Sequence, residues 1–239
     1  MRILYLIIVL MVLVSACDNA GESKEEDKTR KDYVDYFYPT DSLIPFIYVF
    51  QDKNDPLNEK IQRIYRVESP SDTILVVEHF NANFRITEGY SFDVKSFQMV
   101  DHMIVDGDGL KRKAKLSSNS FFPFNKGDLA YFISDFPSHL DSITMVYQSK
   151  KGVSDADYKI DVLGESLPAL LIKDTVTITM ANVFTQKGST RSFVIDRVYA
   201  KGYGLVKWSS EDGSIVYNLE KILNNQWWEE VAQSPQVRW

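Results

Sequence analysis

The sequence predicts a mainly β protein, with a strongly curved antiparallel sheet shaped as a half-barrel or open barrel and one short C-terminal helix. Runs rich in β-branched and aromatic residues recur along the chain, for example at residues 44–50 and 170–180. Turn-forming residues separate these runs, as antiparallel strands require. Gly202 and Gly204 lie one residue apart in a strand-like run, so we expect a bend or bulge of the sheet there.

The strand-like runs follow one another closely. We expect extended segments at residues 44–50, 61–68, 73–80, 84–88, 90–101, 103–105, 110–116, 142–148, 158–163, 170–180, 192–200, 199–208 and 215–219. Residues 106–109 read Asp-Gly-Asp-Gly and give the clearest hairpin turn. Residues 110–116 carry three lysines and Arg112, which suits an exposed edge strand. Residues 219–231 have apolar side chains near helical spacing and predict a helix against the concave side or mouth of the sheet.

The composition fits one folded domain over residues 33–239. Hydrophobic residues make up 44% of the chain and aromatic residues 13%, which is ample for a core. Aromatic side chains at residues 33–38 are expected to join that core. The formal charge of −6 argues against nucleic acid as a partner.

The N-terminal segment has the features of an export signal. Arg2 precedes an apolar run at residues 3–14, which is shorter than the roughly 20 residues that span a bilayer. Leu-Val-Ser-Ala-Cys at residues 13–17 resembles the lipobox of bacterial lipoproteins. The resemblance implies that residues 1–16 are a signal peptide and that Cys17, the single cysteine, carries a lipid anchor to the membrane.

Residues 17–32 follow as a charged tether without apolar periodicity. Acidic residues directly after a lipidated cysteine resemble the signal that sends some Gram-negative lipoproteins to the surface of the outer membrane. We therefore expect an envelope protein that is anchored to the outer membrane and exposed at the surface. Two alternatives stay open: Asp18 also resembles an inner-membrane retention signal, and a flexible linker without any targeting signal explains the same charges.

Residues 199–208 contain Gly-Tyr-Gly-Leu-Val and resemble the terminal strands of LolA- and LolB-like envelope lipoproteins, which have a strongly curved antiparallel sheet. The resemblance covers about 30 residues and implies the curved fold. It brings no catalytic or ligand residues.

The sequence offers no catalytic or metal motif. His79, His102 and His139 are too far apart for a short zinc motif and are interpreted as ordinary strand or surface histidines. We expect no cofactor and no metal. A spatial pair of carboxylates for glycoside hydrolysis stays open, without residues to name.

Four tripeptides of the type Asp-Ser/Thr-aliphatic resemble an O-glycosylation sequon of exported proteins. The acceptors are Ser42, Thr73, Ser142 and Thr175. The alternative is that the same tripeptides simply end turns and open strands.

Trp227 and Trp228 leave a similar choice. They can form a ligand or partner surface, or they can dock the C-terminal helix on the sheet, which is the more common use of such a pair.

These observations favour a non-enzymatic envelope lipoprotein that binds a lipid, a glycan or a partner protein. An envelope hydrolase acting on polysaccharide or peptidoglycan and a structural subunit of an outer-membrane complex are the alternatives.

Overall fold

The computed structural model describes residues 31–41, 43–137 and 142–232. The chain divides into two units, residues 1–31 and residues 32–239, and the second contains every strand described below. The predicted signal peptide, Cys17 and nearly all of the tether lie outside the described residues.

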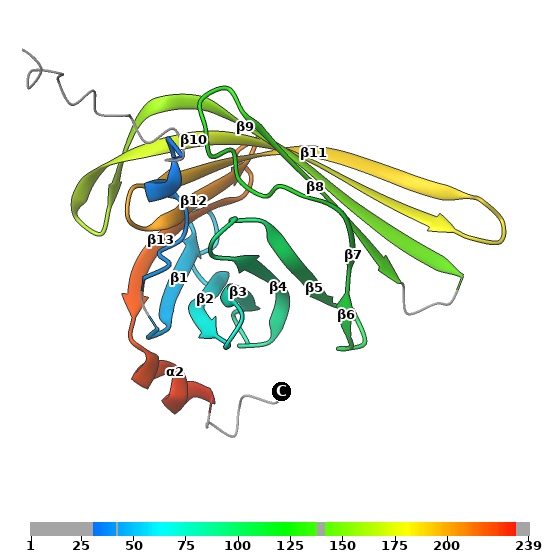
Figure 1. Cartoon of the computed structure of the whole chain (residues 1–239), viewed down its shortest axis with the longest axis horizontal. Coiled ribbons are helices and arrows are strands. Elements are labelled where there is room, and N and C mark those ends of the chain that lie inside the picture. The colour runs from blue at the N-terminus through cyan, green and yellow to red at the C-terminus, as the bar shows by residue number, and fades with distance from the viewer. Residues whose placement is uncertain (1–30, 42, 138–141, 233–239) are drawn as a thin grey trace, which may run out of the picture. The chain divides into compact units, whose positions relative to one another are not determined.

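One antiparallel sheet of thirteen strands forms the body of the protein, as predicted (Figure 1). The strands are β1 (Phe46–Asp52), β2 (Glu59–Glu68), β3 (Thr73–Asn81), β4 (Ile86–Asp93), β5 (Met99–Val105), β6 (Lys111–Lys113), β7 (Lys115–Asn119), β8 (Leu129–Pro137), β9 (Ile143–Val162), β10 (Glu165–Asn182), β11 (Gly188–Ala200), β12 (Gly204–Ser210) and β13 (Val216–Leu223). A short 3-10 helix, η1 (Val34–Tyr36), precedes them, and one helix, α2 (Asn225–Ala232), follows.

The sheet curves into a nearly closed barrel because a single segment forms both of its edges. The spatial order runs from β6 through β5, β1, β13 and β10 to β7, so the two edge strands are neighbours in sequence, separated only by Ala114. The backbone N–H of Ala114 donates to the carbonyl of His102 in β5 at 2.8 Å. The lysine-rich segment that was predicted as an edge strand therefore bridges the seam.

Aromatic side chains fill most of the barrel interior. Tyr48 and Phe50 of β1 point into this core, and so do Phe37 and Tyr38, which follow η1. The predicted burial of the aromatic run at residues 33–38 is thus confirmed for Tyr33, Phe37 and Tyr38.

Helix α2 packs on the opposite side of the sheet from this core. Trp228 clusters with Ile47 and Val49, which alternate along β1 with the inward-facing Tyr48 and Phe50. The helix therefore does not cover the concave side, which is one of the two positions expected for it. It is also shorter than predicted, because residues 216–223 continue the sheet as β13.

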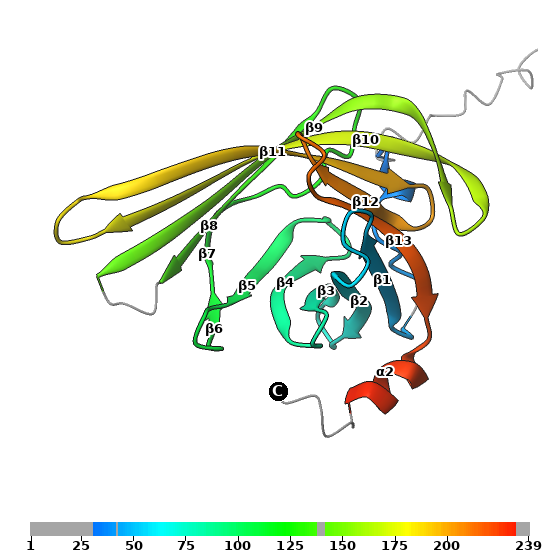
Figure 2. The same cartoon turned by 180° about the vertical axis from the view of Figure 1, so that it is seen from behind.

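Strands β8 to β11 are long and run past the barrel on one side (Figures 1 and 2). Strand β11 pairs with β10 from Gly188 to Ala200, whereas its pairing with β12 covers only Ile195 to Ala200. A step is left in the sheet where β12 ends and β11 continues. This step positions the candidate site.

Two turns test the local predictions. The hairpin at residues 106–109 is confirmed, with the N–H of Gly109 donating to the carbonyl of Asp106 at 3.0 Å. Gly202 and Gly204 do not bend one continuous strand: they reverse the chain between β11 and β12, with φ of 80° and 79°. An L residue strongly disfavours this left-handed region, so glycine suits both positions.

Residues 90–101 also differ from the prediction. They do not form one extended segment, because the chain turns between Asp93 and Met99 and separates β4 from β5. The turn is closed by Asp93, whose carboxylate accepts hydrogen bonds from the N–H and hydroxyl of Ser96.

Candidate functional site

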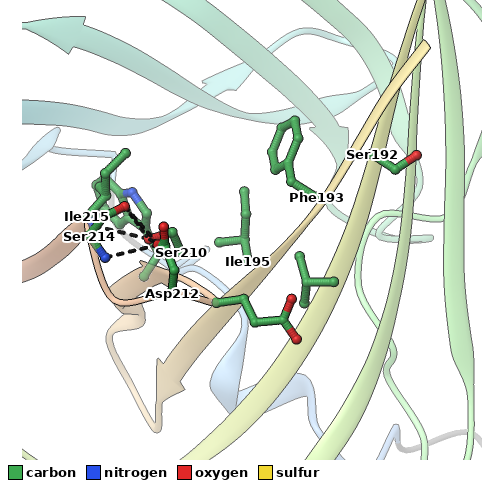
Figure 3. Close-up of a pocket in the computed structure, with 10 residues that line it drawn as sticks. Ser192, Phe193, Ile195, Ser210, Asp212, Ser214 and Ile215 are labelled. Carbon is green, nitrogen blue, oxygen red and sulfur yellow. Dashed lines mark hydrogen bonds between the residues drawn. The ribbon is translucent and has the colours of Figure 1, made fainter.

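An apolar groove, here called the outer groove, occupies the step beside β11. It has a volume of about 620 Å³ and is lined by residues 192–195, Trp208, residues 210–212, Ser214 and Ile215. Phe193 and Ile195 project to the same side of β11, with the turn at residues 210–215 across from them (Figure 3). Phe193 is 44% exposed, so part of this apolar surface faces solvent.

The turn at residues 210–215 forms a well-defined wall of the outer groove. The Asp212 carboxylate accepts hydrogen bonds from the hydroxyl of Ser210 at 2.6 Å and from the N–H of Ser214 at 3.0 Å. These bonds lower the pKa of Asp212 to about 2. The charged groups at this end of the groove, Asp212 and Glu211, are both acidic.

A second, more polar space, here called the polar pocket, adjoins the outer groove and shares Ile195 and Trp208 with it. Its volume is about 220 Å³ and its other lining residues are Lys60, Gln62, His79, Phe80, Thr87, Glu88, Arg197 and Leu205.

Two polar atoms of this pocket lack partners. In the described part of the chain, neither Oε1 of Gln62 nor Nε2 of His79 has a hydrogen-bond partner. Burial lowers the pKa of His79 to about 4, so the imidazole is neutral at neutral pH. Because buried polar atoms normally have partners, these two are available to a ligand or to water.

A third space, the inner chamber, lies deeper in the barrel. It measures about 50 Å³ and shares His79, Glu88, Arg197 and Leu205 with the polar pocket. Its remaining walls are Tyr38, Tyr90, Phe121, Phe132, Tyr147, Lys151 and Tyr199. Burial raises the pKa of Tyr147 and of Tyr199, so both hydroxyls remain protonated.

Arg197 lines the chamber and forms an ion pair with the buried Asp174. The Arg197 Nε donates to Oδ2 of Asp174 at 2.8 Å, and the Ser149 hydroxyl donates to Oδ1 at 2.6 Å. Asp174 is fully buried, which opposes its ionisation, but Lys151, Arg197 and the bond from Ser149 hold its pKa below the usual range. The carboxylate is therefore ionised and directs the guanidinium.

Glu88 is a carboxylate that lines the chamber itself. Burial opposes its ionisation, but hydrogen bonds from His102 and Tyr90 lower its pKa to about 2. The Nε2 atom of His102 lies 3.0 Å from Oε1 of Glu88, and its Nδ1 lies 2.8 Å from the hydroxyl of Ser134. Since His102 is in β5 and Ser134 in β8, this network also ties the two sides of the seam.

Lys151 is a cation without an ion-pair partner in the described residues. Only 2% of it is exposed, and its Nζ donates to the carbonyl of Phe121 at 3.1 Å. The Nζ also lies 3.4 Å from the centroid of the Phe121 ring, a cation–π contact. Burial lowers the pKa of Lys151 to about 7, against the attraction of Asp174.

Strand β11 connects the three spaces. Alternate residues of a strand share one face, and four alternate residues of β11 line the spaces in succession. Phe193 lines the outer groove, and Ile195 lines both the groove and the polar pocket. Arg197 lines both the pocket and the chamber, and Tyr199 lines the chamber. From Phe193 to Tyr199 the strand extends about 20 Å, since a strand rises about 3.3 Å per residue. One face of one strand therefore grades from apolar to charged.

Other kinds of site can be described briefly. No group of three or more His, Cys, Asp or Glu side chains suited to a metal ion occurs among the described residues. Within the same part of the chain, no helix combines the length and apolar character needed to cross a membrane.

The residues nominated from the sequence do not gather at this site. Thr73 opens β3 and is half-buried, Thr175 is exposed in β10, and Ser142 is half-buried just before β9, whereas Ser42 lies outside the described residues. Their glycosylation stays a prediction, as does the lipidation of Cys17.

Trp227 and Trp228 line none of the three spaces. Trp228 is 5% exposed, and the centroid of its ring lies 4.6 Å from that of Phe80. The ring centroids of Trp227 and Phe84 are 5.8 Å apart. Their use as a ligand or partner surface stays a prediction.

The charged residues of the chamber were not predicted from the sequence. The strand pattern does indicate that Asp174 points inward, because it falls on the side of β10 that carries Ile172 and Val176 and is otherwise apolar. His79 and His102 were interpreted as ordinary strand or surface histidines; they are strand residues, but His102 is fully buried and His79 borders two of the spaces. His139 lies outside the described residues.

No protein-family model matches the chain, and no curated protein is significantly similar to it. A solved structure from Parabacteroides distasonis, provisionally described as a lipoprotein, is similar over 79% of this chain and 98% of its own, with 10% identity and a TM-score of 0.45. A structure from Bacteroides fragilis, provisionally described as an exported protein with a YmcC-like fold, covers 79% of this chain and 99% of its own, with 13% identity and a TM-score of 0.38. Likenesses at this level carry no functional argument.

Proposed function

We propose that the protein is a lipid-anchored envelope protein that binds an amphiphilic ligand, whose apolar portion occupies the outer groove. The anchor belongs on Cys17, on the strength of the lipobox-like residues before it. The outer membrane, with the folded body outside the cytoplasm, is the proposed location.

The observation that carries the ligand proposal is an apolar groove of about 620 Å³ joined to a polar pocket through Ile195 and Trp208. Ligand sites are typically mostly apolar concavities of about 300–1,000 Å³ with a few polar groups that fix orientation. The groove supplies the apolar part of such a site and the pocket supplies the polar part.

A lipid-like ligand fits this groove better than a glycan does. Sugar rings bind by stacking on free aromatic faces. The Trp208 ring is already stacked on Tyr217, with ring centroids 4.7 Å apart, and packed against Phe50 at 4.6 Å, which leaves Phe193 as the one exposed aromatic side chain of the groove lining. The remaining apolar lining, including Phe193, Ile195 and Ile215, suits an alkyl chain.

The hydrolase alternative has less support. A glycoside hydrolase needs one carboxyl group with a raised pKa to act as the acid. The two carboxylates beside the chamber, Glu88 and Asp174, both have lowered pKa values.

The test is the binding of a neutral alkyl probe, dodecanol, measured by isothermal titration calorimetry. Phe193→Ser removes apolar surface from the groove and is expected to weaken binding about tenfold. Phe184→Ser is the matched control, because Phe184 is 79% exposed in the connection between β10 and β11 and does not line the groove.

Equal affinity of the two variants for dodecanol, or no binding by the unmodified protein, would refute the proposed groove.

A further inference from the structure

We infer that the ligand is a long-chain carboxylate, whose carboxylate group enters the inner chamber between Lys151 and Arg197 while its alkyl chain extends along β11 into the outer groove. This inference rests on the proposed function and specifies the ligand of the same site.

Unused hydrogen-bond donors point to an anion. A lysine ammonium has three N–H donors, and the described residues supply Lys151 with a single hydrogen-bond acceptor, the carbonyl of Phe121. Arg197 is bound to Asp174 through Nε, which leaves its terminal nitrogens for another acceptor. The hydroxyls of Tyr147 and Tyr199 likewise donate to no other described residue, although both line the chamber.

The carboxylates already present do not meet this need. Asp174 faces Lys151 across β9 and β10, yet its oxygens accept from Ser149 and Arg197. Glu88 accepts from Tyr90 and His102. An incoming carboxylate would give Lys151 the charged acceptor that it lacks, and charge-assisted hydrogen bonds are the strong ones.

The size of the chamber selects the head group. A volume of about 50 Å³ holds a few atoms, because one water needs about 10–15 Å³ of such space. A carboxylate group fits this volume, whereas a sugar or a substituted phosphate exceeds it.

The distribution of charge sets the orientation of the ligand. The charged groups of the outer groove, Glu211 and Asp212, are both acidic, whereas Lys60 lies in the polar pocket, and Arg197 and Lys151 lie at the inner end beside the carboxylate of Glu88. A carboxylate is therefore repelled at the outer end, and at the inner end it meets Lys151, whose ammonium has no carboxylate partner among the described residues. The apolar stripe of Phe193 and Ile195 leads away from the chamber in the direction that the alkyl chain must take.

Binding should be coupled to a proton on Lys151. Its pKa is about 7 in the empty chamber, and a bound carboxylate favours the charged form. The other ionisable groups around it are His79, Glu88, Asp174, Arg197 and the tyrosines; Glu88 and Asp174 stay ionised and His79 stays neutral near pH 7. Affinity for a carboxylate is therefore expected to fall as the pH rises above about 7, a range in which the carboxyl group of the ligand is ionised throughout.

The experiment compares laurate with dodecanol, which share an alkyl chain and differ in the head group. Below pH 7 the unmodified protein is expected to bind laurate at least about tenfold more tightly than dodecanol, and this preference should shrink at higher pH. Lys151→Met should abolish both the preference and its pH dependence, because the charged hydrogen-bond donor to the carboxylate is lost. Lys150→Met is the matched control, since Lys150 is the exposed neighbour on the opposite face of β9.

Equal binding of laurate and dodecanol by the unmodified protein overturns the inference and leaves the proposed function standing. A Lys151→Met variant that keeps the preference for laurate also overturns it. If neither compound binds, both proposals are wrong.

Discussion

Lys151 is a buried charge that lowers the free energy of unfolding. The residue is 2% exposed, and its ammonium has no carboxylate within ion-pairing distance in the described structure. Burying a charge that lacks an ion-pair partner costs free energy, because the charged form loses its hydration. A residue that costs stability and lines a cavity is a reasonable candidate for a functional role.

The pH dependence of stability gives a direct prediction for this residue. Between the folded pKa of about 7 and the ordinary value of 10.5, the unfolded chain binds more protons than the folded chain at Lys151. The free energy of unfolding should therefore rise with pH from about 7 upward, by at most about 1.4 kcal/mol per unit. Urea unfolding at a series of pH values measures this slope.

Lys151→Met should be more stable than the unmodified protein near pH 6 and should lose much of this rise. A variant with an unchanged slope would contradict the assignment of the lowered pKa to Lys151, and Lys150→Met again serves as the control.

The sequence carried part of this information at the residue scale. The inward position of Asp174 could be read from the alternation with Ile172 and Val176. Lys151 could not be found in this way, because the polar run at residues 149–157 resembles a loop, whereas the structure continues β9 through it.

At the scale of elements, the hairpin between β11 and β12 gives a matched pair of glycines. Gly202 and Gly204 have nearly the same positive φ, but a Cβ on Gly202 would meet nothing within 4 Å, whereas a Cβ on Gly204 would lie 2.9 Å from Cδ1 and 3.1 Å from Cα of Tyr38. An alanine at position 202 therefore tests backbone strain alone, whereas an alanine at position 204 tests backbone strain together with a steric clash.

Gly202→Ala is expected to destabilise the protein by about 1–2 kcal/mol through the left-handed conformation alone. Gly204→Ala should cost about 1–3 kcal/mol more, because the residues around Tyr38 must move. Chemical denaturation of the two variants measures the difference, and equal costs would show that Tyr38 does not lie against Gly204.

Strand content was predictable from the sequence, but several connections were not. Alternation and turn residues located most strands, including the hairpin at residues 106–109. The reversal at residues 201–203 was mistaken for a bend, because Gly-x-Gly is compatible with either, and the choice depends on Tyr38, which is more than 160 residues away in sequence.

At the scale of the whole molecule, closure of the sheet brings the site together. β4 and β5 contribute Glu88 and His102, whereas β9, β10 and β11 contribute Lys151, Asp174 and Arg197, and these groups meet only because the sheet curls until its edges join at Ala114. Curvature was expected from the sequence. The register that brings these charges together depends on the pairing of distant strands, which a single sequence does not show.

We expect the protein to carry a bound ligand in the cell. The most direct test is to purify the native protein from the envelope and identify any non-covalently bound compound by extraction and mass spectrometry, with Phe193→Ser and Lys151→Met prepared in parallel. We expect a long-chain carboxylate with the unmodified protein and a much smaller amount with either variant. Recovery of no amphiphile, or of the same amount from all three proteins, would contradict a carboxylate site that runs from the inner chamber to the outer groove.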